Sequence, residues 1–166
     1  MGGGTLSNDD DPAHSVRSGE TSVTTPLLSL LIPGPVLGKG RARSTKAGHH
    51  YTPAATRANE ASLSWYMAQA WGGKPLLDEA LRLELVIHFE VPASWSKKRR
   101  ALALAGEIIP TGKPDLDNVV KSIADSGNGI VWRDDALIAQ LVVHRWYAEA
   151  PSLLVRVCRP LSRHDP

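Results

Sequence analysis

The sequence predicts an α/β (α+β) fold, in which a single domain contains a small mixed sheet packed by two or three helices. Three observations predict it. Residues 81–91 alternate between apolar and polar side chains, the period of a strand with one buried face. Residues 52–71 and the segment from Asp117 have the start signals and spacing of helices. Long connections separate these segments, which favours a mixed architecture over a meander of hairpins.

The N-terminal third combines a tail, a strand and a basic loop. Residues 1–25 contain hardly any apolar side chain, so we expect a disordered acidic tail, followed by a domain over residues 26–160 and a C-terminal tail over 161–166. The apolar run at 27–32 predicts the first strand. Residues 33–51, which we call the cationic arm, predict a loop. No acidic residue occurs between Thr21 and Asn59, whereas five basic residues do: Lys39, Arg41, Arg43, Lys46 and Arg57.

The central segments alternate between helix and strand. Thr52 as N-cap and Pro53 as first helical residue predict a helix that continues to Trp71 and ends at the following glycine pair. Its predicted apolar face contains Ala58, Ala61, Trp65 and Ala68. Pro92 ends the strand at 81–91, and a short capped helix follows with the four basic residues Lys97, Lys98, Arg99 and Arg100. Beyond the next loop, the sequence predicts a helix from about Asp117, a turn at 127–129, and strands at about 138–147 and 153–158.

Composition excludes several classes of protein. The chain has 166 residues, of which 42% are hydrophobic and 22% charged, as expected of one globular domain. No run approaches the ~18 apolar residues of a membrane helix. The single cysteine, Cys158, allows no internal disulfide, and residues 1–11 lack the basic and apolar parts of a signal peptide. We therefore expect a cytoplasmic protein.

Charge is distributed unevenly along the chain. Residues 1–20 have four acidic residues and one arginine, a net charge of −3, so the remainder of this +2 chain carries +5. Within that remainder five acidic residues lie close together in the sequence: Asp115, Asp117, Asp125, Asp134 and Asp135. A cationic body around an acidic centre is typical of a polyanion-binding protein with a metal site. An ordinary solvated surface has the same charge pattern.

The acidic segment is suited to phosphodiester hydrolysis. In an extended segment, Asp115 and Asp117 would lie on the same side of the chain with their Cα atoms about 7 Å apart. Their carboxylates would then hold one divalent ion between them. A helix from Asp117 would place Lys121 one turn further and Asp125 two turns further, and a return of the chain would bring Asp134 and Asp135 alongside. Mg²⁺ takes such hard oxygen ligands, and Lys121 would neutralise charge that develops in the transition state.

A purely structural interpretation fits the same spacing. In it Asp117 is a helix N-cap, Lys121 and Asp125 are a surface ion pair, and Asp134 and Asp135 form a turn. Other motifs fail. An EF-hand from Asp115 would need Gly and Glu where Val120 and Ser126 stand, the glycines near residue 34 lack P-loop spacing, and the histidines lack zinc-ligand spacing. We assign His88 and His144 to strands.

Several segments resemble the RusA family of Holliday junction resolvases. KPDLDNVVK at 113–121 and VWRDDALI at 131–138 resemble the family's signature, and PGPVLGKGRARST, YTPAATRANE and SWSKKRR resemble its upstream segments. The resemblance covers residues 29–147. It implies an α/β homodimer, dependence on Mg²⁺ or Mn²⁺, and paired cuts in a four-way DNA junction during recombination and repair. It also implies a bacterial or phage-infected cell, with no membrane partner and no small-molecule cofactor.

Carried over residue by residue, the resemblance assigns the metal ligands to Asp115, Asp117 and Asp135, with Asp134 adjacent, and the essential lysine to Lys121. Basic residues are expected to bind DNA phosphates: Lys39, Arg41, Arg43, Lys46, Lys97, Lys98, Arg99, Arg100 and Lys113. Trp132 or Tyr51 would stack on an unpaired base or belong to the core. Two alternatives stay open, a non-catalytic protein that binds branched DNA and, more distantly, a phosphatase of small phosphoesters.

The sequence also departs from the family pattern. Gly127 stands within the end of the predicted helix and is expected to shorten it by about a turn. Leu137 replaces the glutamine that usually follows the acidic pair, and Arg145 stands where a lysine often ends the last strand. No proposed metal ligand is missing, so these departures concern substrate preference more than catalysis.

Overall fold

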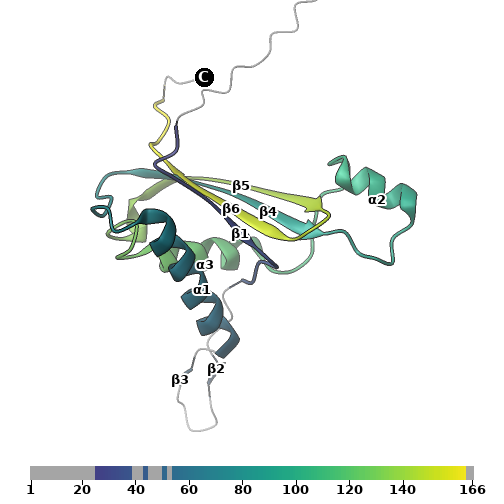
Figure 1. Cartoon of the computed structure of the whole chain (residues 1–166), viewed down its shortest axis with the longest axis horizontal. Coiled ribbons are helices and arrows are strands. Elements are labelled where there is room, and N and C mark those ends of the chain that lie inside the picture. Colours follow the sequence, from purple (N-terminus) through teal and green to yellow (C-terminus); the bar gives the residue numbers. More distant parts are fainter. Residues whose placement is uncertain (1–24, 39–42, 45–49, 52–53, 164–166) are drawn as a thin grey trace, which may run out of the picture.

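The fold is a four-stranded sheet covered on one face by two helices (Figure 1). A computed structural model describes residues 25–38, 43–44, 50–51 and 54–163. Its elements, in chain order, are β1 (Leu28–Pro33), β2 (Arg43–Ser44), β3 (His50–Tyr51), α1 (Ala54–Trp71), β4 (Leu81–Glu90), α2 (Lys97–Leu104), α3 (Leu116–Gly127), the 3₁₀ turn η1 (Asp135–Leu137), β5 (Ile138–Ala148) and β6 (Ser152–Cys158).

The sheet is mixed, as predicted. Its strand order is β1-β6-β4-β5, and β4 pairs in parallel with β5 while its other neighbour is antiparallel. A parallel pair requires a crossover connection. The crossover here contains α2, α3 and η1, and it returns the chain to the sheet at the start of β5. The two acidic segments of the sequence therefore lie on the connection that leads into the edge strand.

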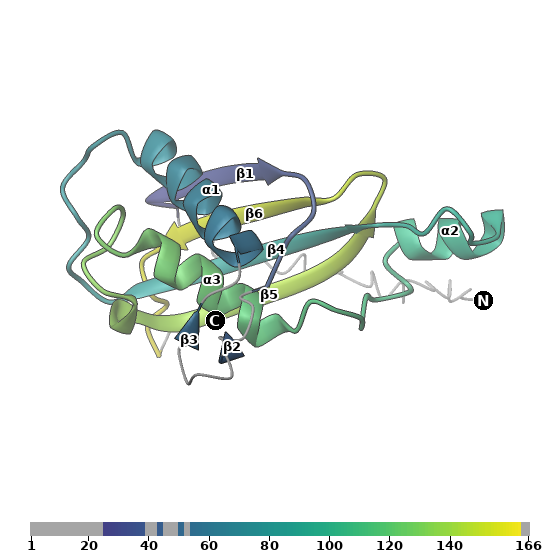
Figure 2. The same cartoon turned by 90° about the horizontal axis from the view of Figure 1, so that it is seen from below.

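Burial of the sheet face follows the alternation predicted for β4. Leu83, Leu85 and Ile87 are buried, and they pack in one core with residues of α1 and α3. Figures 1 and 2 show both helices on the same side of the sheet, whereas α2 projects beyond its end. α3 contributes Val119 and Ile123 to this core. Burial of these side chains fixes which side of α3 remains available to solvent.

The predicted apolar face of α1 is wrong. Ala58, Ala61 and Ala68 are exposed, and Trp65 retains 58% of its accessible surface. The buried stripe consists of Leu63, Met67 and Trp71, which follow one another at four-residue intervals. The reason is size, since these three large side chains remove more apolar surface from water than three alanines can.

The boundaries of α3 also differ from the prediction. The helix begins at Leu116, with Asp115 in extended geometry as its N-cap, and it continues through Gly127 rather than ending a turn earlier. Gly127 is buried. His88 and His144 lie in β4 and β5, as assigned.

Some predictions lie outside the described residues. They are the tail at 1–24, the helix start at Thr52 and Pro53, and the basic residues Lys39, Arg41 and Lys46. Arg43 and Tyr51 are placed in β2 and β3 by their backbone alone. Among the helices that the structure describes, none combines the length and apolar character needed to cross a bilayer.

The two faces of α1 can be tested by mutation. Met67→Ala should lower the free energy of unfolding by about 2–5 kcal/mol, because it leaves a cavity in the core. Trp65→Ala, on the exposed face, should lower it by under about 1 kcal/mol, since it loses little more than an edge-to-face contact with Tyr66. Urea unfolding of both variants measures the difference, and a larger loss for Trp65→Ala would contradict the packing.

Candidate functional site

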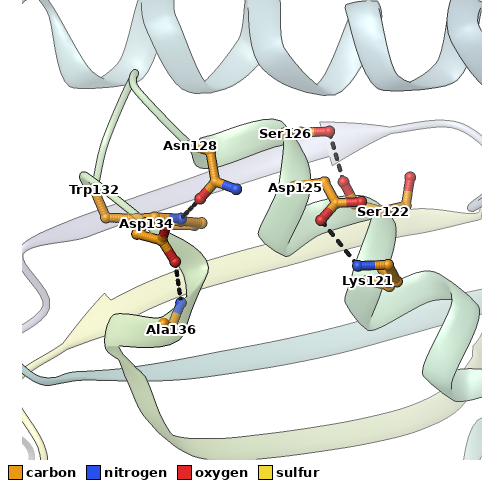
Figure 3. Close-up of polar contacts among 8 residues, drawn as sticks. All are labelled: Lys121, Ser122, Asp125, Ser126, Asn128, Trp132, Asp134 and Ala136. Carbon is orange, nitrogen blue, oxygen red and sulfur yellow. Dashed lines mark hydrogen bonds and ion pairs between the residues drawn. The ribbon is translucent and has the colours of Figure 1, made fainter.

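One side of α3 forms the platform of the site. The helix is amphipathic, with Val119 and Ile123 buried in the core. Asp117 and Lys121 lie on its exposed side, which confirms the polar stripe predicted for this helix. The Nζ atom of Lys121 lies 3.3 Å from Oδ1 of Asp125, one turn further on (Figure 3). This i,i+4 pair holds the lysine along the helix surface.

The inner side of α3 is tied to α1 by small polar side chains. Asn59 donates its Nδ2–H to the Ser122 hydroxyl at 3.2 Å and to the Leu37 carbonyl at 3.2 Å. Ser64 donates to the Ser126 carbonyl at 3.1 Å. These bonds satisfy polar groups between the two helices and restrict rotation of α3, which fixes the direction in which Asp117 and Lys121 point.

The second acidic pair lies at η1, directly before β5. Asp134 is the N-cap of this turn, and its Oδ1 accepts a hydrogen bond of 2.8 Å from the Ala136 backbone N–H (Figure 3). Asp135 is the first residue of the turn. The turn proposed for this pair by the structural interpretation is therefore present, but it uses the carboxylate of Asp134 and leaves that of Asp135 for other contacts.

An open groove joins the two acidic segments. It runs between α3 and the start of β5, and its lining residues are Leu116, Asp117, Val120, Lys121, Ala124, Asp135, Ile138, Leu141 and Val143. Asp117, Lys121 and Asp135 thus meet in one groove, although Asp117 and Asp135 are far apart in the sequence. The return of the chain that was predicted to bring the two pairs together exists, since α3 and η1 pack against each other.

The predicted extended geometry of Asp115 and Asp117 is wrong. Only Asp115 is extended, whereas Asp117 already lies in the first turn of α3. Residues two apart on a helix do not face each other, so the pair does not share one side. Asp115 does not line the groove, and its side chain makes no capping hydrogen bond to the helix. The structural interpretation is also corrected, because the N-cap is Asp115 and not Asp117.

The carboxylates fit a hard divalent cation held in an open site. Within the described ranges, no three His, Cys, Asp or Glu side chains come close enough to enclose an ion. Mg²⁺ usually keeps several waters and is held by one or two carboxylates together with substrate phosphates. Asp117 and Asp135, which line the same groove, would supply such a pair of oxygen ligands. No described residue donates a hydrogen bond to either carboxylate, so both are available for a ligand.

Arg145 fixes the loop that precedes α3, a role that sequence reasoning missed. Its Nη2 donates to the Gly112 carbonyl at 2.7 Å and to the Pro114 carbonyl at 2.8 Å. Its guanidinium also lies 4.9 Å from the Phe89 ring centroid. Arg145 therefore connects β5 to the residues directly before Asp115. No local sequence signal could have identified this contact, because its partners are backbone carbonyls more than thirty positions away.

Gly38, a residue of the cationic arm, packs beside the first turn of α3. A Cβ atom placed on Gly38 would lie 3.1 Å from the Cβ atoms of both Pro114 and Asn118, so the backbone of Gly38 packs closely on this turn. Lys113 is exposed next to it. Gly38 and Lys113 therefore lie beside the start of the helix that carries Asp117.

The four basic residues at the start of α2 have different environments. Ser96 caps the helix by accepting a 3.3 Å hydrogen bond from the Arg99 backbone N–H, and the Arg99 guanidinium lies 3.9 Å from the centroid of the Trp95 ring. Arg100 donates to the carbonyls of Val91 and Pro92, at 3.2 and 3.3 Å. Only Lys97 and Lys98 are exposed without such a contact among the described residues. Arg100, for which DNA binding stays a prediction, holds α2 to the end of β4.

Trp132 belongs to the core. Its side chain is fully buried, and its Nε1–H donates to Asn128 Oδ1 at 2.9 Å (Figure 3). It is thus not available to stack on a base, and of the two roles considered for it, the core role is confirmed.

The role of Arg145 can be tested by Arg145→Met, which removes both hydrogen bonds to the loop. We expect a loss of about 1–3 kcal/mol in unfolding free energy and faster amide hydrogen exchange in the first turn of α3. Arg159→Met is the matched control, because Arg159 is exposed and makes a 3.5 Å surface pair with Glu79. Unchanged exchange in Arg145→Met would contradict the anchoring role.

Comparison with known proteins identifies the family of this chain. A family model described as "Endodeoxyribonuclease RusA" matches residues 33–158, which include the whole groove. A curated relative, "Uncharacterized protein YqaN" of Bacillus subtilis (strain 168), is 39% identical over 64 residues, which is 39% of this chain and 45% of that protein. The aligned part spans less than half of the relative's length. The extent of the family match shows that this chain belongs to the RusA endodeoxyribonuclease family.

Proposed function

We propose that the protein is a Mg²⁺- or Mn²⁺-dependent endodeoxyribonuclease that resolves four-way DNA junctions by phosphodiester hydrolysis. The observation that carries the proposal is the groove lined by Asp117, Lys121 and Asp135. Carboxylates beside an ammonium group, next to a cationic arm, are suited to a phosphate substrate. Membership of an endodeoxyribonuclease family supports DNA as that substrate.

Each acidic residue has a proposed role. Asp117 and Asp135 would hold the cation directly, and the cation would polarise the phosphoryl oxygen and activate a water. Asp115 lies at the N-cap before the groove, where it would bind a water of the ion or a second ion. Asp134 would position Asp135, because its bond to Ala136 fixes the turn on which Asp135 lies.

Lys121 would stabilise charge on the substrate. Hydrolysis forms a bond between a water oxygen and phosphorus and breaks the bond from phosphorus to one ester oxygen, which leaves with a proton. Negative charge increases on the phosphoryl and leaving oxygens, and a nearby ammonium group stabilises that charge. Asp125 would keep the ammonium group at the groove through the 3.3 Å contact.

DNA would be held by exposed positive charge outside the groove. Lys113 lies beside Asp115, and Lys97 and Lys98 lie on α2, which projects beyond the sheet (Figure 2). Together with the cationic arm, these three lysines would bind phosphates on different DNA branches of a junction. Two symmetric cuts require two grooves, so we propose a two-fold homodimer as the active assembly.

The catalytic proposal is tested by Asp117→Asn. Cleavage of a labelled four-way junction in Mg²⁺ should fall at least about a hundredfold, because even partners outside the metal ligands alter metal affinity by 10–100-fold. Junction binding should be unchanged or tighter, since a negative charge near the phosphates is removed. A gel assay measures both, with a matched linear duplex and with EDTA as reference reactions.

Glu79→Gln is the control for this experiment. It removes an acidic charge at an exposed pair with Arg159, and cleavage should stay at the wild-type level. Wild-type cleavage by Asp117→Asn would contradict the site. Binding of the junction by the wild-type chain, with no product in Mg²⁺ or Mn²⁺, would favour the alternative of a non-catalytic protein that binds branched DNA.

Mutations can distinguish a DNA-binding role of Lys97 and Lys98 from the structural role of Arg100. Replacing Lys97 and Lys98 by Ala should weaken junction binding and reduce the slope of log affinity against log salt by about 2, close to 0.9 for each lost phosphate contact. The melting temperature should not change. Arg100→Ala should lower the melting temperature because two backbone carbonyls lose their donor. A salt slope altered more by Arg100→Ala than by the lysine variant would contradict this division.

A further inference from the structure

We propose that Trp132 is a positioning residue that sets the separation between α3 and Asp135, and thereby the metal affinity of the groove. The inference rests on the proposed function, since it assumes that Asp117 and Asp135 share one cation. Trp132 lies between them in the sequence but touches neither the groove nor the substrate, because its side chain is fully buried.

The first support is the packing of the indole against the end of α3. A Cβ atom on Gly127 would overlap the six-membered ring of Trp132, at Cζ2, Cη2 and Cε2. The ring therefore lies directly on the backbone of the last residue of the helix. Only glycine fits there, which explains why a residue that weakens helices occurs at a buried helical position.

The second support is the closed loop that follows α3. Trp132 donates its Nε1–H to Asn128 Oδ1 at 2.9 Å, and its carbonyl accepts the Gly129 N–H at 2.8 Å. The Val131 N–H donates to the Gly127 carbonyl at 2.9 Å. The loop is thus bound to itself and to the helix end, with the indole at its centre (Figure 3).

The third support is a connection to the segment before β4. The Leu77 N–H donates to the Val131 carbonyl at 2.9 Å, and the Arg133 N–H donates to the Leu77 carbonyl at 3.0 Å. The Arg133 guanidinium also pairs with Asp78 at 2.8 Å. The residues on both sides of Trp132 are therefore fixed, and Asp134 caps η1 directly after them. The chain from the end of α3 to Asp135 is thus held by hydrogen bonds on both sides of Trp132, with the indole packed between them and Gly127.

A smaller side chain at 132 should change the distance between the two carboxylates. The cavity would let the loop move towards Gly127, and η1 would move with it. Two ligands that share one ion tolerate little displacement, so affinity for the ion should fall even though no ligand is altered. Changes beyond the metal ligands typically reduce metal affinity by 10–100-fold.

Mn²⁺ binding to the full chain without DNA, measured by isothermal titration calorimetry, tests the inference. Trp132→Leu should raise the dissociation constant about 10–100-fold, and Trp132→Phe should have a smaller effect. Trp71→Leu is the matched control. Trp71 is also buried at the end of a helix, and its Nε1–H donates to the Lys74 carbonyl at 2.9 Å, but it lies on α1. Trp71→Leu should lower the melting temperature to a similar extent and leave Mn²⁺ affinity unchanged.

A second pair of variants covers the case in which Trp132→Leu does not fold. Gly127→Ala should weaken Mn²⁺ binding because its methyl group displaces the indole, and adding Trp132→Phe should restore part of the affinity, since the smaller ring leaves room. Equal weakening by Trp71→Leu and Trp132→Leu, or additive effects at 127 and 132, would overturn the inference.

Asp117→Asn separates this inference from the proposed function. If Asp117→Asn abolishes Mn²⁺ binding while Trp132→Leu binds like the wild type, only the positioning role is wrong. If the wild type binds no Mn²⁺, or Asp117→Asn leaves binding unchanged, the shared metal site is wrong and the positioning role fails with it.

Discussion

The site depends on the way in which α3 packs against both the sheet and α1. Val119 and Ile123 are buried in the core. The Ser126 hydroxyl donates to the Ser122 carbonyl, and Asn59 and Ser64 of α1 donate to the Ser122 hydroxyl and the Ser126 carbonyl. These contacts restrict rotation of the helix about its axis. The resulting orientation leaves Asp117 and Lys121 on the outside, facing the start of β5. The parallel pairing of β4 and β5 then brings η1 to the same place, because the crossover must end beside α3 before it enters the edge strand.

This architecture favours an open site over a closed metal cage. Two carboxylates line a groove at the sheet edge, and the remaining positions of a six-coordinate ion would be available to water and phosphate oxygens. Rigid supports lie at both ends of α3, where Arg145 holds the loop before Asp115 and Trp132 packs on Gly127. Precise placement of few ligands by such surrounding contacts is the general way in which proteins tune metal sites.

The sequence predicted those features whose physical cause is local. The alternation of β4, the polar stripe of α3 and the final strands each depend on periodicity within one segment, and all are present. The predictions that failed depend on distant contacts. On α1, the alanine face and the stripe of Leu63, Met67 and Trp71 have the same helical spacing, so spacing alone does not show which of them is buried. Gly127 was expected to end α3 early, but its role is to accommodate Trp132, and Arg145 binds carbonyls that no side-chain pattern reveals.

The central claim is that Asp117 and Asp135, from two separate segments, bind the same cation. Anomalous diffraction from crystals of the full chain soaked in MnCl₂ tests this most directly, because it locates Mn²⁺ without reference to activity. The account predicts one strong anomalous peak in the groove between α3 and η1, in contact with carboxylate oxygens of both residues. A groove without a peak, or a peak bound to one of these carboxylates and not the other, would contradict it.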